Sequence, residues 1–238
     1  MSLNAKQQKT NSDDMRPEYD FSKGVRGVHA HRFSKLSSDE ALMLDYWRRK
    51  GFEARSFPKN EMRDMKTPDF RLSQAGREVA LCEVKSFQRD TWLEEHMRDA
   101  GSGELVGGLR SDPIYNRISN AVHTAAKQFT SVNSDHKLLN FLVLVNHDTS
   151  AKYQDLVSVL TGYWDPLHGV YEQTHTQFSE GRIRNEKTQI DLYLWLNIHK
   201  DGTLSKESLF FGNPETRLSV CELIGINPMK IKDILPAA

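Results

Sequence analysis

One strand near the middle of the chain constrains the fold more than any other feature of the sequence. From Val79 onward the residues alternate, so Val79, Leu81, Glu83 and Lys85 fall on one face of a strand. A shorter amphipathic segment precedes this strand and begins at Pro68-Asp69, the only Pro-Asp in the sequence. The pattern predicts two neighbouring strands that bring two carboxylates and a lysine together.

A chance match is the first alternative to weigh. The chain contains two other acidic-x-Lys triplets, Asp64-Met65-Lys66 and Asp135-His136-Lys137, and neither lies in a convincing strand. Glu83 and Lys85 could also be an ion pair on a solvated strand face. The apolar residues on the same face argue against this, because charges at the end of a core stripe are costly without a partner or a metal.

The hydrophobic pattern predicts an α/β fold with a mixed central sheet flanked by helices. A first helix begins at Ser37 or Ser38, where Ser37-Ser38-Asp39-Glu40 fits a capping box, and Ala41, Leu44 and Trp47 centre its apolar stripe. Strands are expected at 52–57, 70–72 and 78–86, a helical turn near 92–98, a long helix at 114–129 and a buried strand at 138–145. The last third adds helical segments near 153–160 and 218–224, and a strand at 190–198 that pairs with 209–211.

Length and composition describe an ordinary globular protein. The 238 residues suffice for one large domain, and we expect a flexible arm at 1–36 followed by a single domain with a core at 37–147 and an elaboration at 148–238. The formal net charge of zero argues against a histone-like protein that binds nucleic acid by bulk charge. Two cysteines make no disulfide framework, and no apolar run is long enough for a membrane span, so a cytoplasmic setting is expected.

The order helix, three strands, helix, strand, together with Pro68-Asp69 and Glu83-Val84-Lys85, resembles the PD-(D/E)xK nuclease superfamily, the restriction-endonuclease-like proteins. The resemblance covers 37–147 and implies a metal-dependent nuclease with an αβββαβ core. It places Asp69 and Glu83 as metal ligands and Lys85 as the catalytic lysine. Many members add a Glu on the first helix, and Glu40 stands at that place, although the capping box explains Glu40 equally well.

The chemistry can also be argued from the residue types. Mg²⁺ prefers carboxylate and water oxygens and takes few protein ligands beside substrate phosphates, and Mn²⁺ should substitute for it. A bound Mg²⁺ generates a nucleophilic water near neutral pH. Lys85, two residues after Glu83, projects on the same side and can orient that water or balance charge on the phosphate.

Contacts to a nucleic acid, most naturally DNA, are expected outside this trio. The resemblance implies a polar second helix near the phosphate, which suggests Lys127 or Gln128, with exposed helix residues as the plainer alternative. The loop at 88–112 would close over substrate, with Arg110 and Arg117 as further phosphate contacts. A non-catalytic binding module for nucleic acid or protein is the rival, and pairing into a homodimer stays open. A short resemblance of 18–27 to bacterial toxin–antitoxin proteins implies a bacterial origin.

Overall fold

The structure is a computed structural model that describes residues 36–58, 61, 65–88, 92–104, 114–164, 172–173 and 183–231. Contacts divide the chain into two units, Met1–Leu36 and Ser37–Ala238, and all the helices and strands described belong to the second unit. The predicted arm therefore lies almost wholly outside the described residues.

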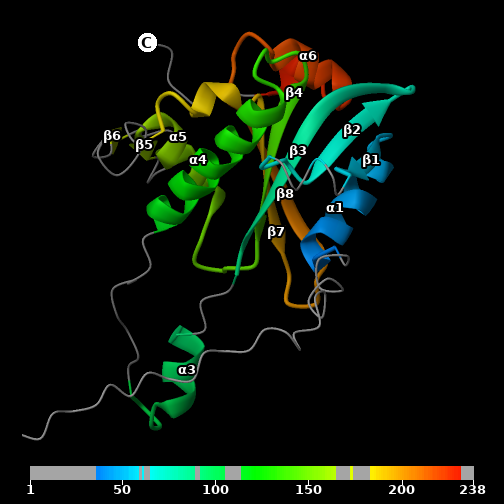
Figure 1. Ribbon diagram of the computed structural model, residues 1–238. Coiled ribbons are helices and arrows are strands. Elements are labelled where there is room, and N and C mark those ends of the chain that lie inside the picture. The colour runs from blue at the N-terminus through cyan, green and yellow to red at the C-terminus, as the bar shows by residue number, and fades with distance from the viewer. Residues whose placement is uncertain are drawn as a thin grey trace, which may run out of the picture. The chain divides into compact units, whose positions relative to one another are not determined.

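A six-stranded mixed sheet forms the centre of this unit (Figure 1). Its strand order is β1-β2-β3-β4-β7-β8, in which β3, β4 and β7 run parallel while β1–β2, β2–β3 and β7–β8 pair antiparallel. The strands are β1 (Glu53–Ser56), β2 (Phe70–Gln74), β3 (Arg77–Phe87), β4 (Leu139–Asn146), β7 (Leu192–Ile198) and β8 (Leu204–Phe211). A separate two-stranded ribbon joins β5 (Tyr163–Trp164) to β6 (Glu172–Gln173).

The β2–β3 hairpin is closed by Ala75 and Gly76, since Gln74 pairs with Arg77. Both turn residues have positive φ, 50° and 76°, which is the geometry that a two-residue hairpin turn requires. The turn sets the register at its own end of the hairpin, and an irregularity between Leu72 and Ser73 then shifts that register by one residue, so that Leu72 pairs with Ala80. The turn and this shift together decide which residue of β2 stands opposite which residue of β3.

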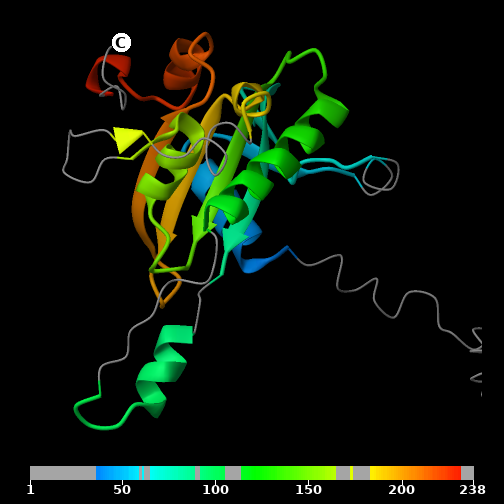
Figure 2. The ribbon, with the colours of Figure 1, turned by 90° about the vertical axis from the view of Figure 1, so that its left-hand side faces the viewer.

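Helices cover both faces of the sheet (Figures 1 and 2). On one face, α4 (Ile114–Val132) and α5 (Tyr153–Thr161) pack against Leu142, Leu144 and Trp195. On the other, α1 (Ser38–Arg49) and α6 (Arg217–Leu223) pack against apolar side chains that point the opposite way from the same strands. The remaining elements are α3 (Trp92–Asp99) and the 3₁₀ turns η4 (Lys187–Gln189) and η5 (Pro228–Lys230).

The predicted α/β class with a mixed sheet between helices is confirmed, and the elements follow the predicted order. The strands β7 and β8 extend this sheet from β4, so the elaboration after residue 147 contributes to the central layer. One detail differs. In α1 the buried residues are Asp39, Met43 and Trp47, whereas Ala41, expected in the apolar stripe, is exposed.

Among the described residues, no helix combines the length and the apolar character needed to cross a membrane.

Trp47 anchors α1 to the sheet, so its truncation should test the packing of this face. Its side chain is 1% exposed and stacks on Phe141 with ring centroids 5.7 Å apart. Trp47→Ala should lower the free energy of unfolding by about 3–5 kcal/mol because it removes a large buried side chain and leaves a cavity. Urea unfolding measures this. The control Leu218→Ala, at a position 68% exposed in α6, should change it by less than about 0.5 kcal/mol.

Candidate functional site

The β2–β3 pair brings Asp69 and Glu83 together. Phe70 pairs with Cys82, so Asp69, just before β2, stands opposite Glu83. The Val84 backbone N–H donates to Asp69 Oδ2 at 2.7 Å, which fixes the Asp69 carboxylate beside β3. The predicted convergence of the two carboxylates is therefore present.

Lys85 lies on the same face of β3 and reaches back to Glu83. Its ammonium bonds Glu83 Oε1 and also donates to Gln128 Oε1 at 3.3 Å. Gln128 in α4 donates in turn to the Thr67 carbonyl at 2.8 Å. This chain of contacts joins α4, β3 and the segment before β2 around one cluster, which we call the Asp69–Glu83–Lys85 cluster.

The Glu83 carboxyl group is almost fully buried. The residue is 1% exposed, and Oε2 has no hydrogen-bond partner within the part of the chain that the structure describes. Burial, and then the Asp69 carboxylate, raise the pKa of Glu83 to about 7, against the opposing effect of Lys85. At neutral pH this carboxyl group is thus poised between its charged and neutral forms.

Asp69 experiences similar forces to a smaller degree. Burial raises the pKa of Asp69, the Val84 N–H opposes this, and the nearby Glu40 carboxylate raises it further. Glu40 is therefore close enough to interact electrostatically with Asp69. Mutual repulsion of this kind is relieved when a cation binds between carboxylates.

The cluster fits a divalent cation in its chemistry. Two carboxylates stand side by side, and one buried oxygen of Glu83 lacks a partner that a cation could supply. Within the described ranges, however, no three His, Cys, Asp or Glu side chains are grouped closely enough to hold a metal ion. The protein would thus offer a partial ligand shell, as Mg²⁺ commonly accepts.

Glu40 has the capping role that the sequence left open. Ser37 N–H donates to Glu40 Oε2 at 2.6 Å, and Glu40 N–H donates to Ser37 Oγ at 3.1 Å. Both halves of the capping box are formed at the start of α1. A metal-binding role for Glu40 would have to coexist with this structural one.

The four predicted nucleic-acid contacts fall in different settings. Gln128 joins the cluster, and Lys127 is exposed on α4. Arg117 donates to the buried Asp148 carboxylate at 3.2 Å and to the Gln88 carbonyl at 3.3 Å, and its guanidinium lies over the Phe87 ring. The structure therefore shows Arg117 bracing the end of β3. Arg110 lies outside the described residues.

Asp39 is a buried acidic residue that the sequence reasoning passed over. It is 4% exposed, accepts a hydrogen bond from Ser86 Oγ in β3, and lies 3.0 and 3.1 Å from His147 Nε2 through its two oxygens. The spacing of four residues gave a signal for its burial, because Asp39 lies one helical turn before Met43, on the same helix face as Met43 and Trp47. The capping-box pattern instead drew attention to its neighbour Glu40.

The capping and ligand roles of Glu40 can be separated by substitution. Ser37→Ala removes the cap and should lower the free energy of unfolding by about 1 kcal/mol. Glu40→Gln keeps an acceptor for the Ser37 N–H and should change stability by less than about 0.5 kcal/mol. Urea unfolding checks both. A ligand role predicts that Glu40→Gln weakens Mn²⁺ binding in calorimetry, and unchanged binding would leave Glu40 as a cap alone.

The raised pKa of Glu83 predicts a pH-dependent stability of the metal-free protein. Between the ordinary value of 4.5 and about 7, the folded state holds a proton that the unfolded state has lost. The contribution of Glu83 to stability is therefore fully present below the ordinary pKa and is lost as pH rises through the folded pKa.

Glu83→Gln removes this titration. As the pH rises through this window, the parent loses stability and the variant does not. The free energy of unfolding of the variant minus that of the parent should therefore be larger above the window than below it, by a few kcal/mol, since one pKa unit corresponds to about 1.4 kcal/mol. Urea unfolding in a chelating buffer measures the gain. Glu53→Gln, at a side chain 63% exposed, is the control and should show none. Parallel pH profiles for Glu83→Gln and the parent would contradict the raised pKa.

Comparisons with protein-family models, with curated proteins and with solved structures each gave no significant match to this chain. The chemistry of the site must therefore be judged from its own residues.

Proposed function

We propose that this chain is a Mg²⁺-dependent nuclease that hydrolyses phosphodiester bonds, most naturally in DNA, with a PD-(D/E)xK site on a restriction-endonuclease-like core. The observation that carries the proposal is the state of Glu83. Its carboxylate is buried beside Asp69 and bonds Lys85 through one oxygen, while the other oxygen has no partner among the residues that the structure describes. Perturbed carboxylates of this kind cluster at functional sites.

Each residue of the cluster has a role in this proposal. Asp69 and Glu83 would bind the metal ion, which when bound polarises the phosphate and lowers the pKa of a bound water. Lys85 would orient that water or balance charge that develops on the phosphate. Gln128 accepts a hydrogen bond from Lys85 and donates to the Thr67 carbonyl, so it holds the ammonium in place.

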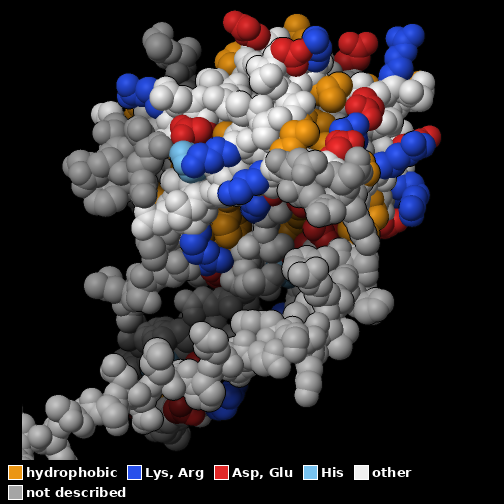
Figure 3. Space-filling model, viewed as in Figure 1, with side chains coloured by type: hydrophobic (Ala, Val, Ile, Leu, Met, Phe, Trp, Pro, Cys, Tyr) orange, Lys and Arg blue, Asp and Glu red, His pale blue; other side chains and the backbone are white. Residues whose placement is uncertain are grey.

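The surroundings are compatible with a polynucleotide. Taken by themselves, the described helices and strands from α1 to β4 follow the αβββαβ order of the nuclease family, with α3 before α4. Lys and Arg side chains gather across the middle of the face shown in Figure 3, which carries α4. Such positive surfaces attract the phosphate backbone.

A binding module without catalysis is the second candidate. One observation is in keeping with it: Glu83 and Lys85 form an ion pair, which a binding module can keep as a structural contact without a metal. Metal binding separates the two candidates, because the nuclease requires an ion at Asp69 and Glu83. The binding module requires none.

The decisive measurement is cleavage of fluorescently labelled DNA with Mg²⁺ or Mn²⁺, beside calorimetric titration with Mn²⁺. Asp69→Asn and Glu83→Gln should lose both metal binding and cleavage, the latter by about 10³-fold, which corresponds to about 4 kcal/mol of the barrier. Lys85→Met should lose cleavage to a similar degree but keep metal binding, since an ammonium is no ligand.

The chain supplies matched controls in one of its two other acidic-x-Lys triplets. Asp135 and Lys137 form an exposed ion pair before β4, so Asp135→Asn and Lys137→Met should leave cleavage and metal binding unchanged. A parent protein that binds no Mn²⁺ would refute the metal site. Cleavage that survives in Glu83→Gln and Lys85→Met would refute the assignment of the residues, and RNA tested in parallel decides between the two polynucleotides.

A further inference from the structure

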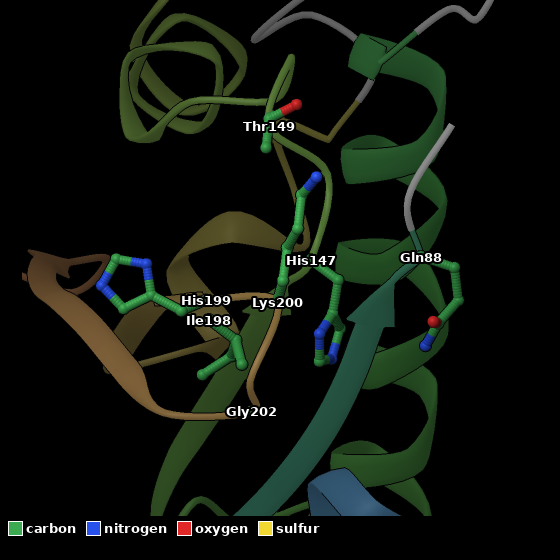
Figure 4. Close-up of a pocket in the computed structure, with 7 residues that line it drawn as sticks. All are labelled: Gln88, His147, Thr149, Ile198, His199, Lys200 and Gly202. Carbon is green, nitrogen blue, oxygen red and sulfur yellow. The ribbon is translucent and has the colours of Figure 1, made fainter. Parts of the chain in front are cut away.

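A hollow opens at the carboxyl ends of the parallel strands, apart from the Asp69–Glu83–Lys85 cluster. Its volume is about 530 Å³, and its wall includes Gln88, His147, Thr149, His199 and Lys200 (Figure 4). We call it the His147 pocket. Ligands of open α/β sheets bind outside the carboxyl ends of the strands, and the volume lies within the range of small-molecule sites.

The described wall of this pocket carries no acidic side chain. An adjoining hollow of about 560 Å³ shares His147, Thr149 and His199, and adds Lys152 and Lys206. Among the described residues that line the adjoining hollow, Asp148 is the single carboxylate, and it already accepts hydrogen bonds from Arg117 and Ser150. The combined wall therefore presents groups that can carry positive charge, and such a wall favours an anion.

His147 is held in place by a buried charge. Its Nε2 donates to the Asp39 carboxylate, because a carboxylate only accepts. Asp39 is 4% exposed and is fixed in turn by Ser86 Oγ, while the His147 backbone N–H donates to the Phe87 carbonyl at 2.9 Å. A histidine bound in this way keeps its other ring nitrogen as a donor when it is charged. The pocket thus contains an oriented side chain, as a built binding site requires.

The pocket lies close to the proposed catalytic strand. Gln88 follows β3 directly and stands three residues beyond Lys85, which is roughly 10 Å along an extended strand. His147 follows Asn146, the partner of Phe87 in the register of β3 and β4. If a nucleic-acid strand is bound at Lys85, a neighbouring phosphate of that strand can therefore reach the pocket.

We infer that the His147 pocket binds a phosphate group, with His147 as the central contact and His199 and the lysines as surrounding cations. The ligand is a nucleotide phosphate, either in the backbone of a strand or on a free nucleotide. The assignment of this phosphate to a strand that is cleaved beside Lys85 rests on the proposed function. The inference that the pocket binds a phosphate group does not rest on it.

The test uses the full chain in a chelating buffer near pH 6.5, about the ordinary pKa of histidine, so that no metal site is needed. Calorimetry with inorganic phosphate and thymidine 5′-monophosphate should detect binding to the parent. His147→Ala should weaken it by about tenfold or more, equivalent to about 1.4 kcal/mol. His199→Ala, at an exposed position where folding is not at risk, should weaken it by about threefold.

His136→Ala is the matched control. His136 lies before the amino end of β4 and bonds the buried Asp191 at 2.8 Å, much as His147 bonds Asp39 after the carboxyl end of that strand. Binding should survive in His136→Ala. No binding to the parent, unchanged binding in both His147→Ala and His199→Ala, or an equal loss in His136→Ala would each overturn the inference.

A short single-stranded oligodeoxynucleotide without terminal phosphates distinguishes the two sources. If it competes with thymidine 5′-monophosphate, the pocket holds a backbone phosphate, and if it does not, the pocket holds a terminal or free one. Failure of DNA cleavage would count against the proposed nuclease but would leave this readout unaffected. The two proposals can therefore fail independently.

Discussion

The burial of the Glu83 carboxylate in β3 is the interaction on which the candidate site depends. A buried carboxylate costs several kcal/mol unless it is neutralised or paired, and β3 is a central strand covered by helices on both faces. The fold partly offsets this cost with Lys85, and Gln128 holds Lys85 where it is needed. Three elements of the chain therefore converge on one carboxyl group.

A purely structural ion pair would need one acid and one base, and the cluster has an additional acid. Asp69 raises the pKa of Glu83, and Glu40 raises that of Asp69, so the arrangement accumulates negative charge in a buried place. Buried ion pairs are weak sources of stability even when they are complete. Within the described residues this pair is incomplete, since one oxygen of Glu83 has no partner, and this supports our proposal that the cluster holds a cation.

The sequence was sufficient for features that depend on local periodicity. Alternation placed Glu83 and Lys85 on one face of β3, the capping box marked the start of α1, and the apolar run of β4 marked a buried strand. The sequence pattern did not predict which side chains would contact each other in the tertiary structure. The contact of Arg117 with Asp148 was not predicted, and Asp39 was passed over although it is buried. Such outcomes depend on which segments, distant in sequence, become neighbours, and periodicity does not encode this.

The two ends of β4 carry similar His–Asp pairs with different surroundings. Asp191 is fully buried and accepts hydrogen bonds from His136, from Thr216 and from the Asn140 backbone N–H, which ties β7 to the entry of β4. The pair of Asp191 and His136 has a structural role, because both carboxylate oxygens of Asp191 already accept hydrogen bonds within the fold. The pair of Asp39 and His147 uses the same chemistry but borders an open pocket at the carboxyl end of the sheet. Both histidine side chains are partly exposed, His136 at 32% and His147 at 26%, but His147 lines the pocket and is therefore the better candidate for a ligand contact.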